Sequence, residues 1–251
     1  SWLAIGLYFI LYLRRGWNMR TFILMFAVFM DLILLTRFKM HIKTVLFCAG
    51  LELMAFFCFS EAGFYSLFFC FFIIGILKWI RKILKKRSDV SSYKISNFLY
   101  SAGIPIVLCL WEFVDCYFVN DVEQYQHKID LLIVCSIAAI ISDTAASEIG
   151  QLFKVKTYSI IKFCPVEPGE DGGVSFIGTI SSMMLTLIFM IFTQSYISYH
   201  VKEFVIVYLF SIVSCFIDSI LGATIQKKGV ISNEQTNFFS VLFTVMLIFF
   251  I

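Results

Sequence analysis

Charged residues are scarce in this chain: Asp, Glu, Lys and Arg together make up 15% of its 251 residues. Soluble globular domains carry about 25%. Hydrophobic residues contribute 60% instead, and they are gathered in long runs. This composition excludes an ordinary soluble domain, and it makes the membrane span of about 20 residues the natural unit of the sequence.

Metal-binding and disulfide patterns are also missing. None of the eight Cys residues forms a C-x-x-C pair, and nearly all lie within apolar runs, where cysteine packs as a small hydrophobic side chain. The three His residues, His41, His127 and His200, are far apart and provide no ligand cluster. These absences favour helix packing over zinc or disulfide chemistry for the Cys residues. We also expect no nucleic-acid partner.

Nine apolar stretches can be counted along the chain. They are Trp2–Leu13, Phe22–Leu35, Thr44–Phe59, Ala62–Ile80, Ile104–Val119, Ile129–Ile141, Val174–Thr193, Phe204–Ile225 and Phe238–Ile251. Several are too short to span a bilayer without help from their flanks, so we expect about seven to nine spans. The predicted fold is an all-α polytopic transmembrane helical bundle, with residues 1–251 forming one integral membrane domain.

The basic residues predict which ends of the spans face the cytoplasm. If all nine stretches cross, most of the 20 Lys and Arg residues fall on one side of the membrane, and the positive-inside rule makes that side cytoplasmic. Arg14, Arg15 and Arg20 fall on the other side, so the first two stretches could instead form a re-entrant hairpin. Residues 81–95 are predicted to be a basic cytoplasmic loop. Its Lys and Arg side chains bind either anionic lipid headgroups or the phosphate of a lipid substrate.

Polar residues interrupt the apolar pattern at three places, of which residues 142–150 are the first. A carboxylate at the centre of a membrane helix costs roughly 2.5–3.5 kcal/mol on insertion scales, so such groups persist where they face water, a cation or a polar substrate. On a helix, Asp143 lies four residues from Ser147, and Thr144 lies four from Glu148. These side chains suit a divalent cation such as Mg²⁺. The alternative is polar packing between helices.

The second place is the segment 165–175, which leads directly into a long apolar helix. It contains Gly169, Gly172, Gly173 and Ser175. A Gly-rich loop that feeds a helix N-terminus can present backbone N–H groups to phosphate. The acidic pair at positions 170–171 opposes that role unless a cation lies between it and the anion. A plain turn between two spans is the alternative, because Gly-rich loops alone are weak signals.

The third place is Asp218, which interrupts the run Phe204–Ile225 well inside its apolar length. An unpaired carboxylate is hard to tolerate there. Its predicted companions are Ser219, Gly222 and Gln226 on the same helical stretch, and Asn233 and Asn237 at the start of the final helix. In the alternating topology all three polar segments fall on the cytoplasmic side. A common polar site at that surface is therefore possible.

These segments, in this order, resemble the pattern of a family of polytopic membrane proteins that includes transmembrane protein 19 and the plant and cyanobacterial phytyl-phosphate kinases. The pattern reads roughly D-T-x-A-S-E-x-G, then P-x-G-x-x-G-G-V-S/T-x-x-G, then D-S-x-L-G-A-T-x-Q and N-N-x-x-N, and the resemblance covers about residues 71–251. The matching positions are Asp143, Thr144, Ala146, Ser147, Glu148 and Gly150; Gly169, Gly172, Gly173, Val174, Ser175 and Gly178; Asp218, Ser219, Leu221, Gly222, Ala223, Thr224 and Gln226; and Asn233 and Asn237. The chain departs from the pattern at Ala145, at Glu234, at positions 170–171, and at residues 93–97, which lack an expected Arg.

The resemblance implies phosphoryl transfer from CTP or another nucleoside triphosphate to a polyprenyl monophosphate, which yields the diphosphate. On this hypothesis Asp143, Glu148 and Asp218 are the catalytic residues and organise Mg²⁺. The groups that bind phosphate or substrate are Thr144, Ser147, Gly169, Gly172, Gly173, Ser175, Ser219, Gly222, Gln226, Asn233 and Asn237. The prenyl tail would lie in the lipid bilayer among the helices. Phosphoryl transfer depends mainly on positioning and charge neutralisation, which such residues can provide.

Two other classes of function remain open on the sequence. A transporter or flippase of anionic or lipid-linked solutes would also place a carboxylate inside the membrane and interrupt a helix near the site. A non-catalytic membrane scaffold would keep the fold while the site residues diverge. An assay for phosphoryl transfer to a prenyl phosphate distinguishes the kinase hypothesis from the transporter and scaffold hypotheses.

Overall fold

The computed structural model describes residues 49–50, 56, 60–85, 95–114, 122–153 and 155–250. Contacts divide the chain into two compact units, Ser1–Phe57 and Cys58–Ile251, and the elements that follow belong to the second unit. The predicted stretches Trp2–Leu13, Phe22–Leu35 and Thr44–Phe59 lie almost wholly outside the described residues.

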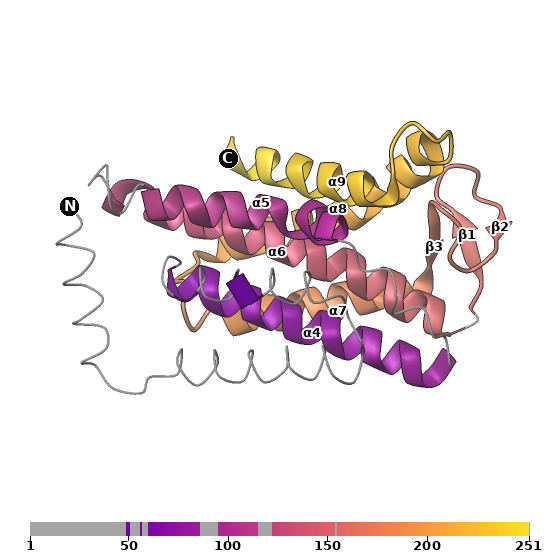
Figure 1. Cartoon of the computed structure of the whole chain (residues 1–251), viewed down its shortest axis with the longest axis horizontal. Coiled ribbons are helices and arrows are strands. Elements are labelled where there is room, and N and C mark those ends of the chain that lie inside the picture. The colour runs from indigo at the N-terminus through magenta and orange to yellow at the C-terminus, as the bar shows by residue number, and fades with distance from the viewer. Residues whose placement is uncertain are drawn as a thin grey trace. The chain divides into compact units, whose positions relative to one another are not determined.

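A helix occupies each of the other six predicted stretches (Figure 1). The helices are α4 (Glu61–Lys85), α5 (Ile95–Val114), α6 (Val122–Leu152), α7 (Phe176–Thr193), α8 (Val201–Leu221) and α9 (Asn233–Phe249). α4 continues through Lys85 and α5 begins at Ile95, so helix takes up the first five residues and the last residue of the predicted basic loop 81–95, and the cytoplasmic placement of that segment stays a prediction. Apolar runs mark only the lipid-embedded part of a helix, and polar turns extend it beyond the membrane.

The centre of the bundle is α6, which packs against α4, α5, α7, α8 and α9. Its middle is buried on every side: Leu132, Ile133, Val134, Cys135 and Ile137 are at most 1% exposed. A helix that is apolar all round belongs inside a bundle. This explains why the predicted run Ile129–Ile141 is short. The polar C-terminal end of α6 also lies against protein, where Glu148 and Gly150 are buried, so hydropathy understates the length of the helix.

The outer helices are apolar outside and carry small hydroxyl residues inside. The buried hydroxyl residues on α7, α8 and α9 are Ser182, Thr186, Thr193, Ser211, Ser214, Thr236, Ser240 and Thr244. The exposed large residues at helical spacing on the same helices include Ile180, Met184, Ile188, Val205, Leu209, Phe239, Phe243 and Met246. Small hydroxyl residues let membrane helices approach closely and hydrogen-bond, as Ser142 on α6 and Ser182 on α7 do at 2.7 Å.

Three described helical segments are long and apolar enough to cross a membrane: Gln126–Leu152, Phe176–Thr193 and Val201–Gln226. Shorter apolar helical segments cover Glu61–Leu77 and Ala102–Glu112. The polytopic helical prediction is supported to this extent. The total of seven to nine spans, and the side of the membrane that each loop faces, stay predictions.

Two polar contacts fix the register between α4 and α6. Ser60, just before α4, donates to Asp130 Oδ1 at 3.1 Å, and Arg81 donates to Gln151 Oε1 at 2.7 Å; both pairs are 70 residues apart in sequence. The two helices therefore run parallel. The 21 residues from Ser60 to Arg81 rise roughly 31 Å as a helix, close to the hydrocarbon thickness of about 30 Å. One polar layer lies at each end of an apolar interior.

A small antiparallel sheet lies at the Arg81 end of the bundle (Figure 1). Its strands are β1 (Thr157–Ser159), β2 (Pro165–Val166) and β3 (Gly173–Ser175), in the order β2-β1-β3. The all-helical prediction is corrected here, since the segment 165–175 contributes two strands instead of only a loop. Pro165 is tolerated because β2 is an edge strand. β3 leads directly into α7, where Ser175 caps the helix by accepting the Gly178 N–H at 3.1 Å.

Candidate functional site

A polar cavity of about 140 Å³ opens between the ends of α6, α7 and α8 and the sheet. A single water needs roughly 10–15 Å³ by this kind of measure, so the cavity has room for several waters or a phosphoryl group. The predicted site residues that line it are Asp143, Ser147, Gly169, Gly172, Gly173, Ser175, Asp218, Ser219, Gly222, Gln226 and Asn233. Three segments that are remote in sequence thus meet at one site.

Two carboxylates face each other in this cavity. Asp143 on α6 and Asp218 on α8 lie within hydrogen-bonding range of each other. The Asn237 amide, oriented so that its nitrogen faces acceptors, donates to Asp218 Oδ1 at 2.9 Å and to the Asn233 carbonyl at 3.0 Å. Two ionised carboxylates at this separation repel each other strongly unless a proton or a cation lies between them. The pair is therefore suited to binding a cation.

The backbone changes its helical repeat directly after Asp218. The last turn of α8 passes into a π-helical turn, η2 (Gly222–Gln226), and Gly222 and Gln226 line the cavity. Short π-helical turns occur frequently at functional sites. Here the wider turn keeps both residues beside the carboxylate pair.

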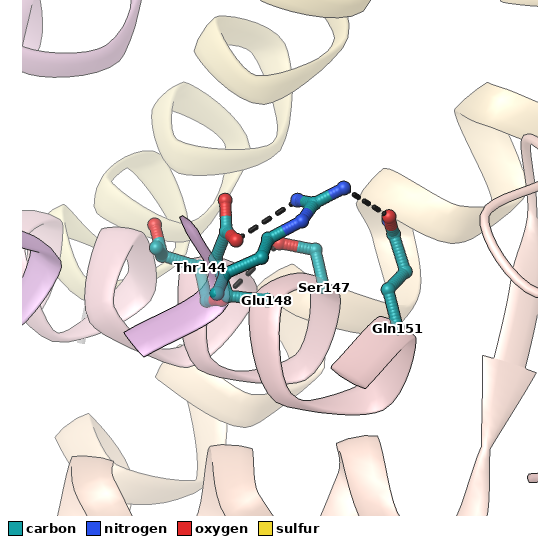
Figure 2. Close-up of polar contacts among 5 residues, drawn as sticks. Thr144, Ser147, Glu148 and Gln151 are labelled. Atoms are coloured by element: carbon teal, nitrogen blue, oxygen red, sulfur yellow. Dashed lines mark hydrogen bonds and ion pairs between the residues drawn. The ribbon is translucent and has the colours of Figure 1, made fainter. Parts of the chain in front are cut away.

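Glu148 and Thr144 do not line the cavity, although they share a helix with Asp143. In Figure 2, Glu148 and Gln151 project from successive turns of α6 toward one guanidinium group, that of Arg81, which donates to them at 2.9 and 2.7 Å. Five residues along an α-helix correspond to a rotation of about 140°. Glu148 therefore points away from Asp143 and toward α4.

The predicted metal set is reduced by this geometry. In the part of the chain that the structure describes, no group of three or more His, Cys, Asp or Glu side chains could hold a metal ion. Asp143 and Asp218 stay together, whereas Glu148 is held by Arg81. The two Asp residues, with neutral oxygen groups around them, are the set that fits a divalent cation such as Mg²⁺, which is usually held by one or two carboxylates plus substrate phosphates.

The glycines of the second motif serve close packing. Gly172 has a φ of +74°, and a Cβ there would lie 2.3 Å from Ala223 Cβ of η2. A Cβ on Gly178 would lie 2.8 Å from the Ala146 carbonyl oxygen of α6. The Gly173 N–H donates to the Glu170 carbonyl at 2.9 Å. The loop therefore forms one wall of the cavity, and that N–H group closes a turn instead of facing a phosphate.

An exposed ion pair joins this loop to the turn after η2. Lys227 Nζ lies 2.5 Å from Glu170 Oε1. The hydrogen bond and charge of Lys227 lower the pKa of Glu170, and the same contact raises the pKa of Lys227. Lys227 thus offsets the charge of Glu170, and whether a cation lies between the acidic pair at 170–171 and a bound phosphate stays a prediction. Asp171 remains in the lining of the cavity.

Sequence reasoning missed two contributors near the site. Gln151 follows the first motif directly, lines the cavity and packs beneath Gly169, where a Cβ would lie 3.3 Å from its Cδ. Arg81 was recognised only as one cation of a basic run. The sequence contains no local signal for either residue. Arg81 and Gln151 are 70 residues apart, and their contact appears only when α4 and α6 lie side by side.

Comparison with known proteins identifies the family. The family described as integral membrane protein DUF92 matches residues 44–245, a range that holds both carboxylates, the sheet and most of α9. The chain belongs to the DUF92 family. It is therefore an integral membrane protein, as its composition predicted.

Among the relatives of this DUF92 protein is an uncharacterized membrane protein of Methanocaldococcus jannaschii, 28% identical over 193 residues that cover 71% of the chain and 76% of the relative. An uncharacterized membrane protein of Synechocystis sp. is 28% identical over 116 residues, 46% of the chain and 45% of the relative. Protein PGR of Arabidopsis thaliana is 36% identical over 98 residues, 35% of the chain and 34% of the relative. The chain thus matches less than half the length of the last two. No solved structure matches the chain.

Proposed function

We propose that this DUF92 protein is a magnesium-dependent phosphotransferase that converts a polyprenyl monophosphate to the diphosphate, with CTP or another nucleoside triphosphate as donor. The observation that carries the proposal is the pair Asp143 and Asp218, which face each other in a polar cavity inside a membrane protein. Such a pair favours a bound cation, and phosphoryl transfer is a reaction that needs a cation beside phosphate oxygens.

In the proposed reaction, an oxygen of the prenyl monophosphate forms a bond to the terminal phosphorus of the donor. The bond between that phosphorus and its bridging oxygen breaks, and a nucleoside diphosphate leaves with the electron pair. Mg²⁺, when bound, neutralises charge on the phosphate oxygens. Asp143 and Asp218 would hold it, and Asn237 fixes the rotamer of Asp218 through its 2.9 Å hydrogen bond.

The remaining lining residues fit a role in orientation. Ser147, Ser219 and Gln226 offer hydroxyl and amide groups to phosphate oxygens from two walls of the cavity. At about 140 Å³ the cavity suits phosphoryl groups, so the nucleoside and the prenyl chain extend outside it. The apolar outer faces of α7, α8 and α9 give the prenyl chain a lipid environment beside the site.

The test uses the full chain in lipid nanodiscs with Mg²⁺, radiolabelled CTP or ATP, and farnesyl or longer prenyl monophosphates. Labelled prenyl diphosphate is the expected product. Asp143→Asn and Asp218→Asn should each lower its rate by about 100-fold or more, as loss of one preorganised electrostatic group does. Glu167→Gln is the matched control, because this exposed acid lies on the neighbouring loop and does not line the cavity.

Full activity in both Asp variants would overturn the assignment of the metal site. Absence of transfer from every nucleotide, together with uptake of prenyl phosphate into proteoliposomes, would favour the transporter hypothesis. Absence of both activities in protein that remains folded would favour the scaffold hypothesis.

A further inference from the structure

A second pair of carboxylates, one buried and one half-buried, lies at the opposite end of the bundle from the cavity. Glu112 near the end of α5 is 2% exposed, and Asp130 lies near the start of α6. The Gln126 amide donates to Glu112 Oε1 and also contacts Asp130. Ser60, just before α4, donates its hydroxyl hydrogen to Asp130 Oδ1 at 3.1 Å and lies beside Glu112. The start of α4 and the helices α5 and α6 thus bring four polar side chains into contact with one another.

The donors at this point do not satisfy both carboxylates. Ser60 has one hydroxyl hydrogen, which goes to Asp130, while its oxygen accepts the Gly63 N–H at 3.0 Å and its backbone N–H lies beside Glu112. In the described part of the chain, Glu112 Oε2 is buried and has no hydrogen-bond partner. Burial of an ionised oxygen without a partner is strongly unfavourable, especially beside a second carboxylate. Among the described residues, no Lys or Arg side chain pairs with Glu112.

The other titratable groups at this end are engaged elsewhere or point outward. His127 pairs with Glu203 at 3.1 Å, and Lys128 lies over an aromatic ring of α9 at 5.0 Å. Glu61, in the first turn of α4, is exposed. Tyr199 donates its hydroxyl hydrogen to a threonine at the end of α7. Among the described side chains, none of these supplies the missing partner of Glu112 Oε2.

We propose that Glu112 and Asp130 bind one small monovalent cation, an alkali metal ion or a proton, at the face of the membrane opposite the cavity. The pair brings two carboxylates together, and Ser60 Oγ adds a neutral oxygen. This set is too small for Ca²⁺, which takes six to eight oxygens. Asp130 and Asp143 are 13 residues apart on α6, a rise of about 20 Å, so this site is separate from the proposed phosphoryl-transfer site and independent of it.

The bound cation would join α4, α5 and α6 at this end. A ligand that binds only the folded state stabilises it in proportion to the logarithm of one plus concentration over Kd. A proton held by the pair acts in the same way: the folded state binds a proton that the unfolded state releases, so stability rises as the pH falls. In both cases ion binding at one membrane face becomes visible as thermal stability.

The experiment measures thermal unfolding of the full chain in nanodiscs by tryptophan fluorescence. One series replaces choline chloride by LiCl, NaCl or KCl at constant ionic strength and pH 7.5, and a second lowers the pH from 8 to 5.5 in choline chloride. We expect the wild-type Tm to rise by at least about 2 °C in one series. A rise in the first series identifies a metal ion, and a rise in the second alone identifies a proton.

Variants connect the shift to the two carboxylates. Glu112→Gln and Asp130→Asn should each abolish the alkali-ion shift and reduce the pH shift, to which the pair Asp143 and Asp218 also contributes. Glu112→Gln should leave the ion-free Tm at or above that of the wild type, because the amide carries no charge. Ser60→Ala keeps both carboxylates and should raise the half-saturating concentration about 10-fold. Glu61→Gln, which removes an exposed carboxylate at the same end, should preserve the shift. A flat wild-type Tm in both series, or an undiminished shift in Glu112→Gln, would overturn the proposal.

Discussion

At the residue scale, the facing carboxylates Asp143 and Asp218 are the basis of the proposed cation site. Asn in place of Asp218 removes one of two facing charges and keeps the size of the side chain. We therefore expect Asp218→Asn to be as stable as the wild type or more stable in EDTA, even though phosphoryl transfer is lost. Thermal unfolding in EDTA tests this, and a Tm several degrees below the wild type would show that the pair does not repel.

Substitution of two glycines that share one backbone angle φ distinguishes the cost of steric crowding from the cost of backbone strain. Gly172 and Gly229 both have a φ of +74°, but only Gly172 has a neighbour, Ala223, where a Cβ would be. Gly229→Ala should cost about 1–2 kcal/mol for the left-handed conformation. Gly172→Ala adds overpacking of about 1–3 kcal/mol. Denaturant unfolding of both variants measures the difference, and equal losses would contradict the contact between the loop and η2.

The sequence indicated which residues gather at the candidate site, but it did not indicate which way each side chain points from its helix. Asp143 and Asp218 were expected at one site because the alternating topology puts their segments on the same side and the family pattern links them, and the structure brings them together. Glu148 was grouped with them by motif. The rotation of α6 turns it toward Arg81 instead. Glu112 and Asp130 were missed because neither belongs to the three polar segments that the sequence analysis singled out.

At the scale of elements, the contact of α4 with α6 beside the cavity depends on one guanidinium group. Arg81 is 26% and Glu148 11% exposed at the side chain, so loss of one partner leaves a partly buried charge. A double-mutant cycle with Arg81→Gln and Glu148→Gln should give a coupling of about 1.5–3 kcal/mol. Arg81→Lys should recover only part of this coupling, because one ammonium group cannot reproduce the two hydrogen bonds that the planar guanidinium donates to Glu148 and Gln151.

The exposed pair Glu170 and Lys227 is the matched control for that cycle. Its coupling should be smaller, since surface pairs are screened by solvent. The pKa of Glu170 is lowered by Lys227, so its contribution is present at neutral pH and disappears as the pH falls through the lowered value. Repetition of both double-mutant cycles at acidic pH tests whether the Glu170–Lys227 coupling falls as the pH is lowered. A Glu170–Lys227 coupling that grows in acid would contradict the assignment.

The six described helices were predictable from the apolar runs, and the sheet was not. β2 has two residues and β1 and β3 have three each, too few to show the alternation that marks a strand. The polar turns at the ends of α4 and α6 were also underestimated. At the end of α6, Glu148 is buried and Gln151 accepts a hydrogen bond from Arg81 of α4, and hydropathy does not report such contacts with protein.

At the scale of the whole molecule, the chain is an integral membrane protein of the DUF92 family with polar layers at both ends of α4 and α6. The layer with the sheet contains the carboxylate cavity, and the opposite layer contains Glu112 and Asp130. Composition predicted the membrane class directly. The convergence of the three motifs depends on helix order and register, which no single segment of the sequence specifies.

The central claim is that Asp143 and Asp218 together form one divalent-cation site. Titration of Mn²⁺ into the full chain in nanodiscs, followed by electron paramagnetic resonance, tests it most directly. The account predicts a site of one Mn²⁺ per chain that Mg²⁺ displaces, and a loss of affinity of about 10-fold or more in both Asp143→Asn and Asp218→Asn, with Glu167→Gln unchanged. Mn²⁺ binding of wild-type strength in both Asp variants would contradict it.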